Sequence, residues 1–216
     1  MLEVTLASGN SHKAEEFKKL FLSSEGSFSI NKSPKQIDVP ETGLTYAENA
    51  YLKAKAYYDA FKRPVMSDDS GLDVRELPGE LGVHSARFGG DGLTDFDRVN
   101  LLLEKLKGVP EERREATFTC VLCFYLNPEE TFFFEGKLKG KISEFISGEK
   151  GFGYDPIFIP KDVTLDELKS QGIEIKEFDE GCLTLATIPS WKELHSHRAK
   201  AVNQSMKFFQ ERFAKR

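Results

Sequence analysis

Hydrophobic positions along the chain follow two different periods, which predict strands and helices in turn. At the start, Leu2, Val4 and Leu6 alternate with polar residues, as in a half-buried strand. The turn-forming residues 8–10 interrupt this alternation, and apolar residues then return at helical spacing. These apolar positions are Ala14, Phe17, Leu20 and Phe21. The chain therefore opens with a predicted strand, loop and helix.

A second helix is predicted where Thr45 and Glu48 have the spacing of a capping box, with Thr45 as the N-cap. Apolar residues continue behind them at helical spacing, namely Ala47, Ala50, Ala54, Tyr57 or Tyr58, and Phe61. Pro64 ends this helix, because the residue before a proline disfavours the helical conformation. A short apolar strand starts at Val65 and runs into the acidic segment 67–71.

The second half of the chain adds a helix, a hairpin and a final helix. Thr94 starts the helix, and its predicted buried positions are Phe96, Val99, Leu102, Leu103 and Leu106. Residues 116–126 alternate as a strand, with Phe118, Cys120, Leu122 and Phe124 on one face. After a turn at Asn127-Pro128, residues 131–134 run back as the second strand of a hairpin. A helix follows Ser196 and places Ala199, Val202, Met206, Phe209 and Phe213 on one face.

These elements predict an α/β fold, with a mixed β-sheet and flanking helices, in one domain of residues 1–216. Hydrophobic residues make up 39% of the chain and charged residues 30%, a composition that excludes a disordered or fibrous protein. The formal net charge of −5 argues against a protein that coats nucleic acid, and no apolar run approaches the length of a membrane span. No secretory signal opens the sequence, so we expect a cytoplasmic protein.

Cysteine usage supports this expectation, because three cysteines are too few for a disulfide scaffold. Cys120 and Cys123 have the CxxC spacing, but strand alternation places them on opposite faces. No second CxxC or nearby histidine pair completes a zinc site. We therefore interpret these two residues as buried thiols.

The loop after the first strand is a candidate phosphate-binding site. It joins a strand to a helix start, where free backbone N–H groups and the positive end of the helix dipole attract anions. Lys13, in the first helical turn, adds a positive charge. The candidate residues are Ser8, Gly9, Asn10, Ser11, His12 and Lys13. The pattern is not a Walker A motif, and an ordinary turn with a polar cap is the alternative interpretation.

The acidic segment is the strongest candidate for a metal site. The adjacent carboxylates of Asp68 and Asp69 are costly to bury at a strand end unless they bind a cation or accept hydrogen bonds. Such oxygens suit Mg²⁺, which takes one or two carboxylates together with substrate phosphates and water. Glu41 could complete the site, and Lys53, on the same helix face as Asn49, could reach a phosphate. Alternatively, the aspartates cap a turn, Glu41 is an ordinary loop carboxylate and Lys53 is solvated.

Two later segments suit a nucleotide. Residues 151–156 combine two glycines that let a ligand approach the backbone, two aromatic rings that could stack on a base, and the acceptor Asp155. His197 and Arg198 begin the last helix, where the dipole disfavours cations, so a bound anion would explain them. Lys192 lies nearby in the sequence. A glycine-aromatic corner and a basic surface cluster are the respective alternatives.

These segments, in this order, resemble the inosine triphosphate pyrophosphatase family of RdgB-type dITP/XTP pyrophosphatases. The matching segments are SGNSHKAEEF at 8–17, ETGLTYAENAYLKA at 41–54, SDDSGL at 67–72, SARF at 85–88, GFGYDPIF at 151–158 and SHRAKA at 196–201. The resemblance implies an elongated mixed α/β fold with two lobes around a central cleft, assembled as a homodimer. It also implies Mg²⁺-dependent hydrolysis of ITP, dITP and XTP to the monophosphate and pyrophosphate, which cleanses the nucleotide pool.

The resemblance also implies roles for individual residues. Asp69 matches the general base and a metal ligand, and Glu41 matches the second metal ligand, although Asp68 remains an alternative base. The residues that match substrate-binding positions are Ser8, Gly9, Asn10, Ser11, His12, Lys13, Lys53, Ser70, Arg87, Phe152, Gly153, Tyr154, Asp155, Lys192, His197 and Arg198. A pocket lined by donors such as His197 and Arg198 would favour a 6-oxo purine over adenine, which presents an amino donor.

Two other functions are alternatives. A Maf-like nucleotide pyrophosphatase would share the architecture but would hydrolyse modified pyrimidine nucleotides. A non-catalytic nucleotide-sensing module would bind a nucleotide without releasing pyrophosphate. In each case the expected partner is a small molecule, and neither a nucleic acid nor a membrane is expected.

Overall fold

The computed structural model describes residues 2–22, 28–170, 172 and 183–214 of the chain. The chain forms two compact units, each of which combines segments from distant parts of the sequence. The first unit comprises Met1–Ser70, Cys120–Lys137 and His197–Arg216, and the second comprises Gly71–Thr119 and Leu138–Ser196. The predicted phosphate loop and the aspartate pair therefore belong to the first unit, and the segment 151–156 belongs to the second.

Six strands form a sheet in the order β2-β1-β3-β4-β5-β6. Their bounds are β1 Leu2–Ala7, β2 Phe28–Lys32, β3 Val65–Val74, β4 Glu115–Asn127, β5 Glu130–Ile142 and β6 Phe158–Pro160. β1 pairs in parallel with β2 and with β3, whereas β6 pairs antiparallel with β5. The predicted mixed sheet is therefore confirmed, with β2 and β6 as two strands that the sequence pattern did not predict.

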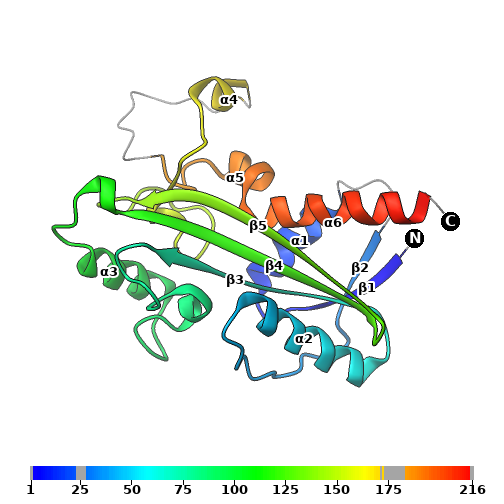
Figure 1. Cartoon of the computed structure of the whole chain (residues 1–216). Coiled ribbons are helices and arrows are strands. Elements are labelled where there is room, and N and C mark those ends of the chain that lie inside the picture. Colours follow the sequence, from blue (N-terminus) through cyan, green and yellow to red (C-terminus); the bar gives the residue numbers. More distant parts are fainter. Residues whose placement is uncertain (1, 23–27, 171, 173–182, 215–216) are drawn as a thin grey trace. The chain divides into compact units, whose positions relative to one another are not determined.

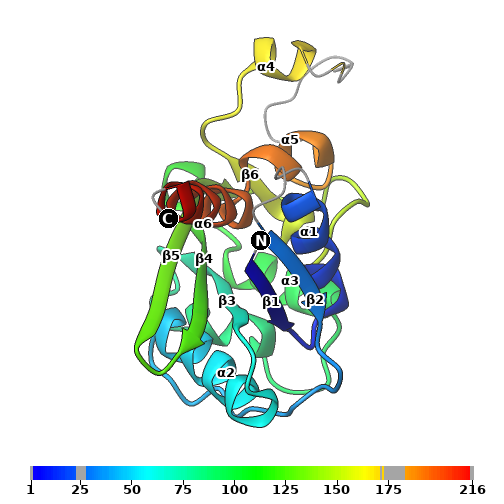
Figure 2. The ribbon, with the colours of Figure 1, turned by 90° about the vertical axis from the view of Figure 1, so that its right-hand side faces the viewer.

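In the first unit, helices cover both faces of the sheet (Figure 1). α1 (Ser11–Leu22) and α6 (His197–Ala214) pack on one face, and α2 (Tyr46–Phe61) packs on the other, as the turned view also shows (Figure 2). The core beneath α1 and α6 contains Val4, Leu6, Phe17, Phe21, Met66, Cys120, Leu122, Phe124, Ala201, Val202 and Phe209. The core beneath α2 contains Ala7, Ala50, Ala54, Tyr57, Val65, Cys123 and Tyr125.

The predicted start of α2 is confirmed in atomic detail. The side chain of Thr45 accepts a hydrogen bond from the Glu48 N–H, and the side chain of Glu48 accepts one from the Thr45 N–H. This reciprocal pair satisfies two backbone donors that the first helical turn would otherwise leave without partners. The capping box therefore defines where α2 begins and, with it, where the candidate site residues on this helix lie.

β3 is longer than the sequence pattern predicts, because it continues through the acidic segment to Val74. Gly71 lies within this strand and makes no turn. A Cβ atom at this position would lie 2.1 Å from the carbonyl oxygen of Gly82, so the close passage of another backbone segment requires glycine. The expectation that the strand ends at the aspartates is wrong, since Asp68 and Asp69 lie inside β3.

The predicted hairpin is confirmed. β4 and β5 are neighbours in the sheet and are joined at residues 128–129, where Asn127 Oδ1 accepts a hydrogen bond from the Glu129 N–H at 2.9 Å. Both faces of β4 are buried, with Cys120 in one core and Cys123 in the other. Burial raises the pKa of each of these thiols to about 12, which confirms them as buried thiols. Cys182 lies outside the described residues.

The second unit has its own core, to which α3 (Asp95–Lys105), α4 (Leu165–Ser170) and α5 (Pro189–His195) contribute. In the described part of this unit, short 3-10 helices also lie at Gly82–Arg87, Glu111–Arg113 and Asp155–Ile157. Within the described part of the chain, no helix combines the length and the hydrophobicity needed to cross a bilayer.

α3 begins after Thr94 as predicted, and Thr94 forms a capping box with Asp97. Its buried positions include Val99 and Leu102, but Phe96 is 66% exposed, so its predicted burial is wrong. Phe96 lies in the first turn of α3, where its neighbours Asp95 and Asp97 are exposed as well, and the buried residues of the helix begin only at Val99.

Candidate active site

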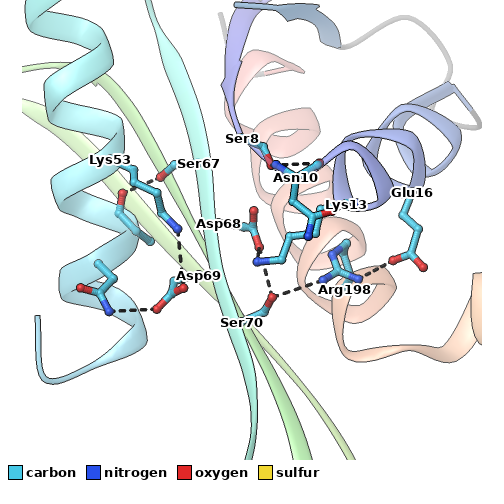
Figure 3. Close-up of polar contacts among 12 residues, drawn as sticks. Ser8, Asn10, Lys13, Glu16, Lys53, Ser67, Asp68, Asp69, Ser70 and Arg198 are labelled. Carbon is cyan, nitrogen blue, oxygen red and sulfur yellow. Dashed lines mark hydrogen bonds and ion pairs between the residues drawn. The ribbon is translucent and has the colours of Figure 1, made fainter. Parts of the chain in front are cut away.

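The carboxylates of Asp68 and Asp69 point to opposite faces of β3 (Figure 3). Successive side chains of a strand alternate between its two faces, so Asp68 shares a face with Ser70. Asp69 shares the other face with Ser67. β1 pairs with β3 as far as Ala7 and Ser67, and the loop after β1 therefore begins beside the aspartates. Each aspartate has its own set of partners.

Asp68 is a buried carboxylate surrounded by cations. Its Oδ2 atom lies 2.9 Å from Lys13 Nζ and accepts a hydrogen bond from the Ser70 hydroxyl at 3.3 Å. Burial by itself would raise the pKa of this carboxyl, but the charges of Lys13, Lys53 and Arg198 outweigh burial and lower the pKa to about 2. Asp68 therefore stays ionised at neutral pH and anchors the ammonium of Lys13.

Arg198, the second residue of α6, is almost fully buried. Its guanidinium donates hydrogen bonds to Glu16 of α1 and, at 3.2 Å, to Ser70 Oγ. Glu16 compensates the charge that the helix dipole disfavours at this position. Arg198 therefore has an anionic partner within the protein, and its binding of an anionic ligand stays a prediction. Because Ser70 also donates to Asp68, the guanidinium belongs to the group of side chains around that carboxylate (Figure 3).

His197 is buried beside Arg198 at the start of α6. The backbone of β5 passes close to it, since a Cβ atom on Gly136 would lie 2.0 Å from the His197 carbonyl oxygen. This contact fixes the first turn of α6 against the sheet and, with it, the guanidinium of Arg198.

On the other face of β3, Asp69 points toward α2. Its Oδ2 atom accepts a hydrogen bond from Asn49 Nδ2 at 3.2 Å, and its Oδ1 atom lies 3.6 Å from Lys53 Nζ. Burial raises the pKa of Asp69, and the nearby charges of Lys53 and Lys13 do not cancel that effect. Asp69 is therefore the member of the pair with the greater affinity for a proton.

Lys53 joins Asp69 to the third predicted carboxylate. Its Nζ atom lies 2.5 Å from Glu41 Oε1. Burial opposes the charged form of Lys53, but the charges of Asp68, Asp69 and Glu41 outweigh burial and raise the pKa. Asp69 and Glu41 thus share a single cation, which is the ammonium of Lys53.

This shared position bears on the predicted metal site. Among the residues that the structure describes, no group of three or more His, Cys, Asp or Glu side chains is placed to bind a metal. The pair of Asp69 and Glu41 fits Mg²⁺ nevertheless, because Mg²⁺ takes one or two protein carboxylates and completes its shell with water and substrate phosphates. The contact of both carboxylates with one ammonium indicates that they can reach one cation.

The loop between β1 and α1 is ordered by its own hydrogen bonds. Asn10 caps α1, since its side chain accepts from the Lys13 N–H at 3.1 Å and its carbonyl accepts from the Ala14 N–H at 3.0 Å. Ser8 Oγ accepts from the Asn10 N–H at 3.3 Å. The N–H of Lys13 is therefore not one of the free helix-start donors predicted for this loop, although the Lys13 ammonium lies beside Asp68. The exposed loop residues are Gly9, Asn10, Ser11 and His12.

In the second unit, Asp155 and Lys192 form a buried ion pair, with Lys192 Nζ 2.6 Å from Asp155 Oδ2. The same oxygen accepts a hydrogen bond from the Phe152 N–H at 2.8 Å, and Lys192 Nζ lies 4.7 Å from the centroid of the Phe152 ring. A Cβ atom on Gly151 would lie 2.1 Å from Asp155 Oδ2, so this turn requires glycine. Asp155 therefore holds the glycine-rich segment against α5.

The other candidates of the second unit differ in exposure. Tyr154 is buried and donates to the Ser85 carbonyl at 2.8 Å, and burial raises its pKa. The expectation that both aromatic rings offer a stacking face is therefore wrong for Tyr154, whereas Phe152 is half-buried. Gly153 donates its N–H to Asp95 of α3 at 2.9 Å. Arg87 is exposed at the end of the first 3-10 helix.

Three residues of these networks were not among the predicted site residues. Asn49 bonds Asp69, Glu16 bonds Arg198, and Asp95 bonds Gly153. The available signal for Asn49 was its position on the same helix face as Lys53. The structure buries Asn49 fully. No local pattern distinguishes Glu16 or Asp95, because their partners lie far away in the sequence.

Comparison with known proteins gives matches along nearly the whole chain. A family model described as the Ham1 family matches residues 4–208. A dITP/XTP pyrophosphatase from Malacoplasma penetrans is 36% identical over 98% of this chain and 100% of its own length. Another from Geobacillus kaustophilus is 40% identical over 94% of this chain and 92% of its own. The solved structure of the Staphylococcus aureus Ham1 protein has a TM-score of 0.78 and 34% identity, covering 97% of this chain and 99% of that one.

Proposed function

Because this chain belongs to the Ham1 family, we propose that it hydrolyses the deaminated purine nucleoside triphosphates ITP, dITP and XTP to the monophosphate and pyrophosphate. Its relatives that are named dITP/XTP pyrophosphatases support this substrate class. The observation that carries the proposal is the aspartate pair of β3, in which Asp68 stays ionised among cations and Asp69 keeps a raised pKa. The reaction would remove deaminated purines from the nucleotide pool.

Asp69 is the proposed general base. Its carboxylate takes a proton from water as the water oxygen attacks the α-phosphorus. The bond between the α-phosphorus and the oxygen that bridges to the β-phosphorus breaks, and pyrophosphate leaves with that electron pair. The raised pKa of Asp69 supports this choice, and the pKa of about 2 makes Asp68 a poor proton acceptor.

Lys13, Lys53 and Arg198 are the proposed phosphate-binding cations, together with the loop Ser8–Lys13. All three influence the charge of Asp68, so they gather around one position of β3. Negative charge shifts toward the leaving pyrophosphate during the reaction, and fixed cations stabilise that charge without having to reorganise. The contacts of Arg198 with Ser70 and Glu16 favour a role toward the phosphates over a role toward the base.

Mg²⁺ is the proposed cofactor, and Asp69 and Glu41 are the residues that would hold it. A bound Mg²⁺ supplies positive charge that offsets the charge of the phosphate oxygens. The support from this chain is that both carboxylates contact the same ammonium.

Base recognition is assigned to the segment Phe152–Asp155 and Lys192 of the second unit. Hypoxanthine and xanthine carry an acceptor at position 6, where adenine carries an amino donor. The ammonium of Lys192 can donate but not accept, so it would favour a 6-oxo base. The half-buried ring of Phe152 is available for stacking, whereas that of Tyr154 is not.

We also propose that residues 1–216 act as one pyrophosphatase domain, that the protein is a homodimer and that it works in the cytoplasm, where free nucleotides are handled. Light scattering after size-exclusion chromatography tests the dimer directly. A molar mass equal to one chain at micromolar concentration would contradict it.

The test of the activity is a panel of ITP, XTP, dITP, GTP, ATP and dUTP, with pyrophosphate release measured in the presence of Mg²⁺ and after EDTA treatment. We expect ITP, dITP and XTP to be hydrolysed in preference to the others, and EDTA to abolish turnover. Chromatography should show IMP as the first product from ITP, and IDP as the first product would contradict the proposal. Preference for pyrimidine nucleotides would instead indicate the Maf-like activity, and binding without pyrophosphate release would indicate a sensing module.

A further inference from the structure

Lys53 has contacts that its proposed role toward phosphates does not explain. Its ammonium lies 2.5 Å from Glu41 Oε1 and 3.6 Å from Asp69 Oδ1, and only 15% of its side chain is exposed. These two carboxylates are the pair that fits a divalent cation. Lys53 therefore faces the oxygens that a metal would need.

An ammonium and a divalent cation cannot both occupy the space between two carboxylates, because like charges repel strongly at such distances. Resting on the proposed function, we propose that Lys53 is the built-in counter-ion of the metal site. In the free protein its ammonium holds the place of the metal between Asp69 and Glu41, and it moves away when the metal and the nucleotide phosphates arrive together. The phosphates then provide the anionic partner that Lys53 loses.

Asn49 allows this exchange to occur without loss of the site. Its Nδ2 group donates to Asp69 Oδ2 at 3.2 Å, and its Oδ1 atom accepts from the Gly43 N–H at 2.8 Å. Asn49 is fully buried and thus holds both Asp69 and the segment that carries Glu41. The carboxylates keep their places while the flexible four-carbon stem of Lys53 turns.

Asp68 provides a natural comparison on the opposite face of β3. Its own ammonium partner, Lys13, lies 2.9 Å away, and Ser70 donates a hydrogen bond to the same carboxylate. A lysine of the same unit can therefore be removed near the aspartate pair without removing the ammonium that lies between Asp69 and Glu41.

In the free protein, Lys53 and a metal ion would compete for the same place. Metal binding alone must displace Lys53, so the measured affinity is reduced by the small fraction of molecules in which the site is vacant. Removal of the ammonium should strengthen the binding of the metal alone, although it also removes a proposed phosphate ligand. Metal binding and catalysis should therefore respond in opposite directions.

The experiment titrates Mn²⁺, as the probe metal without nucleotide, into the full chain and follows free Mn²⁺ by electron paramagnetic resonance. We expect Lys53→Met to bind Mn²⁺ at least about tenfold more tightly than the wild type, because one competing unit charge is gone. Lys55→Met is the matched control, since Lys55 lies on the same helix but pairs with the exposed Asp59. It should leave the affinity unchanged. Lys13→Met should have a smaller effect than Lys53→Met, and Lys53→Met with Glu41→Gln should lose the gain.

An equal gain in Mn²⁺ affinity in Lys53→Met and Lys13→Met would show a general electrostatic effect and would overturn the proposal. Unchanged or weaker Mn²⁺ binding by a folded Lys53→Met variant would overturn it as well. If that variant does not fold, nitrogen NMR of the lysine ammonium groups in the wild type decides, with the Lys53 signal assigned from Lys53→Arg. Saturating Mg²⁺ should shift that signal, and an unmoved signal would refute the exchange. ITP hydrolysis by the wild type is measured in parallel, so that failure of the proposed activity is distinguished from failure of this inference.

Discussion

At the scale of single residues, the aspartates of β3 show how the two faces of one strand can give the same side chain different chemistry. Asp68 is held ionised by surrounding cations, with a pKa of about 2, whereas burial raises the pKa of Asp69. The difference arises from the pleat of the strand, which directs one carboxylate toward α1 and α6 and the other toward α2. This arrangement supports the proposed division into an anchor, Asp68, and a base, Asp69.

The Asp69→Asn variant tests that division. The change is nearly isosteric, so the Asn49 side chain can still bond position 69, but the proton acceptor and one metal-binding charge are lost. We expect kcat for ITP to fall by about 100-fold or more, with an unchanged circular dichroism spectrum.

The matched variant is Asp68→Asn, which removes the partner of Lys13 but leaves the proposed base. It should act mainly through a higher KM, because it disturbs a phosphate-binding cation. Near-normal kcat in Asp69→Asn at saturating Mg²⁺, or the larger kcat loss in Asp68→Asn, would contradict the assignment.

At the scale of secondary-structure elements, α2 carries both Asn49 and Lys53 and depends on its capping box for a defined start. Thr45 is exposed, so its contribution comes from capping and not from burial. We expect Thr45→Ala to lower the free energy of unfolding by about 1 kcal/mol. For a chain of this size that corresponds to a fall in Tm of about 2–4 °C by calorimetry. Thr45→Ser, which keeps the hydroxyl, should unfold close to the wild-type temperature, and equal losses in both variants would exclude the cap as the cause.

A second prediction at this scale concerns β4, both faces of which are buried. Burial favours the neutral thiols of Cys120 and Cys123, so their folded pKa of about 12 exceeds the ordinary value of 9.0. Their contribution to stability is therefore complete below pH 9 and is lost as the pH rises toward 12. At pH 8, iodoacetamide should leave both residues unmodified in the native protein and should alkylate both in urea, as peptide mass spectrometry would report. Rapid alkylation of either cysteine in the native protein would show that at least one face of β4 is accessible to solvent.

At the scale of the whole molecule, the candidate residues are divided between two compact units with separate cores. The first unit contains the aspartate pair and the cations around it, and the second contains the ion pair of Asp155 and Lys192 beside Phe152. If the first unit serves the phosphates and the second the base, substitutions in the two units should change different properties of the same reaction.

The ratio of kcat/KM for ITP over ATP measures this difference. Arg198→Ala should lower both values by about 10- to 150-fold, the range expected for one lost charge-assisted hydrogen bond, and leave their ratio unchanged. Arg198→Lys, which keeps a charge beside Glu16, should lose less. Lys192→Arg keeps a cation for Asp155 but moves its donors, and it should lower the ratio. A changed ratio in the Arg198 variants with a constant ratio in Lys192→Arg would reverse the proposed roles of the two units.

Local patterns determined much of this protein. Period-two and helical spacing predicted β1, α1, α2, α3, the β4–β5 hairpin and α6, because each element has one face that must be buried. Local patterns also predicted the capping box at Thr45 and the two opposite faces of Cys120 and Cys123. The short strands β2 and β6 were not predicted, since three to five residues carry too little periodicity to be recognised.

Tertiary structure decided what those local patterns left open. Gly71 reads as a turn in the sequence but lies inside β3, because the backbone at Gly82 passes beside it. In the sequence, Arg198 is a cation at a helix start, and only the fold brings Glu16, 182 positions away in the chain, into contact with it. Asp68 and Asp69 are identical neighbours in the sequence, and only their distant partners give them opposite pKa shifts. Burial and charge act through space, so residues far apart in the chain set the protonation and the role of each side chain, whereas periodicity acts along the chain and can be seen in the sequence alone.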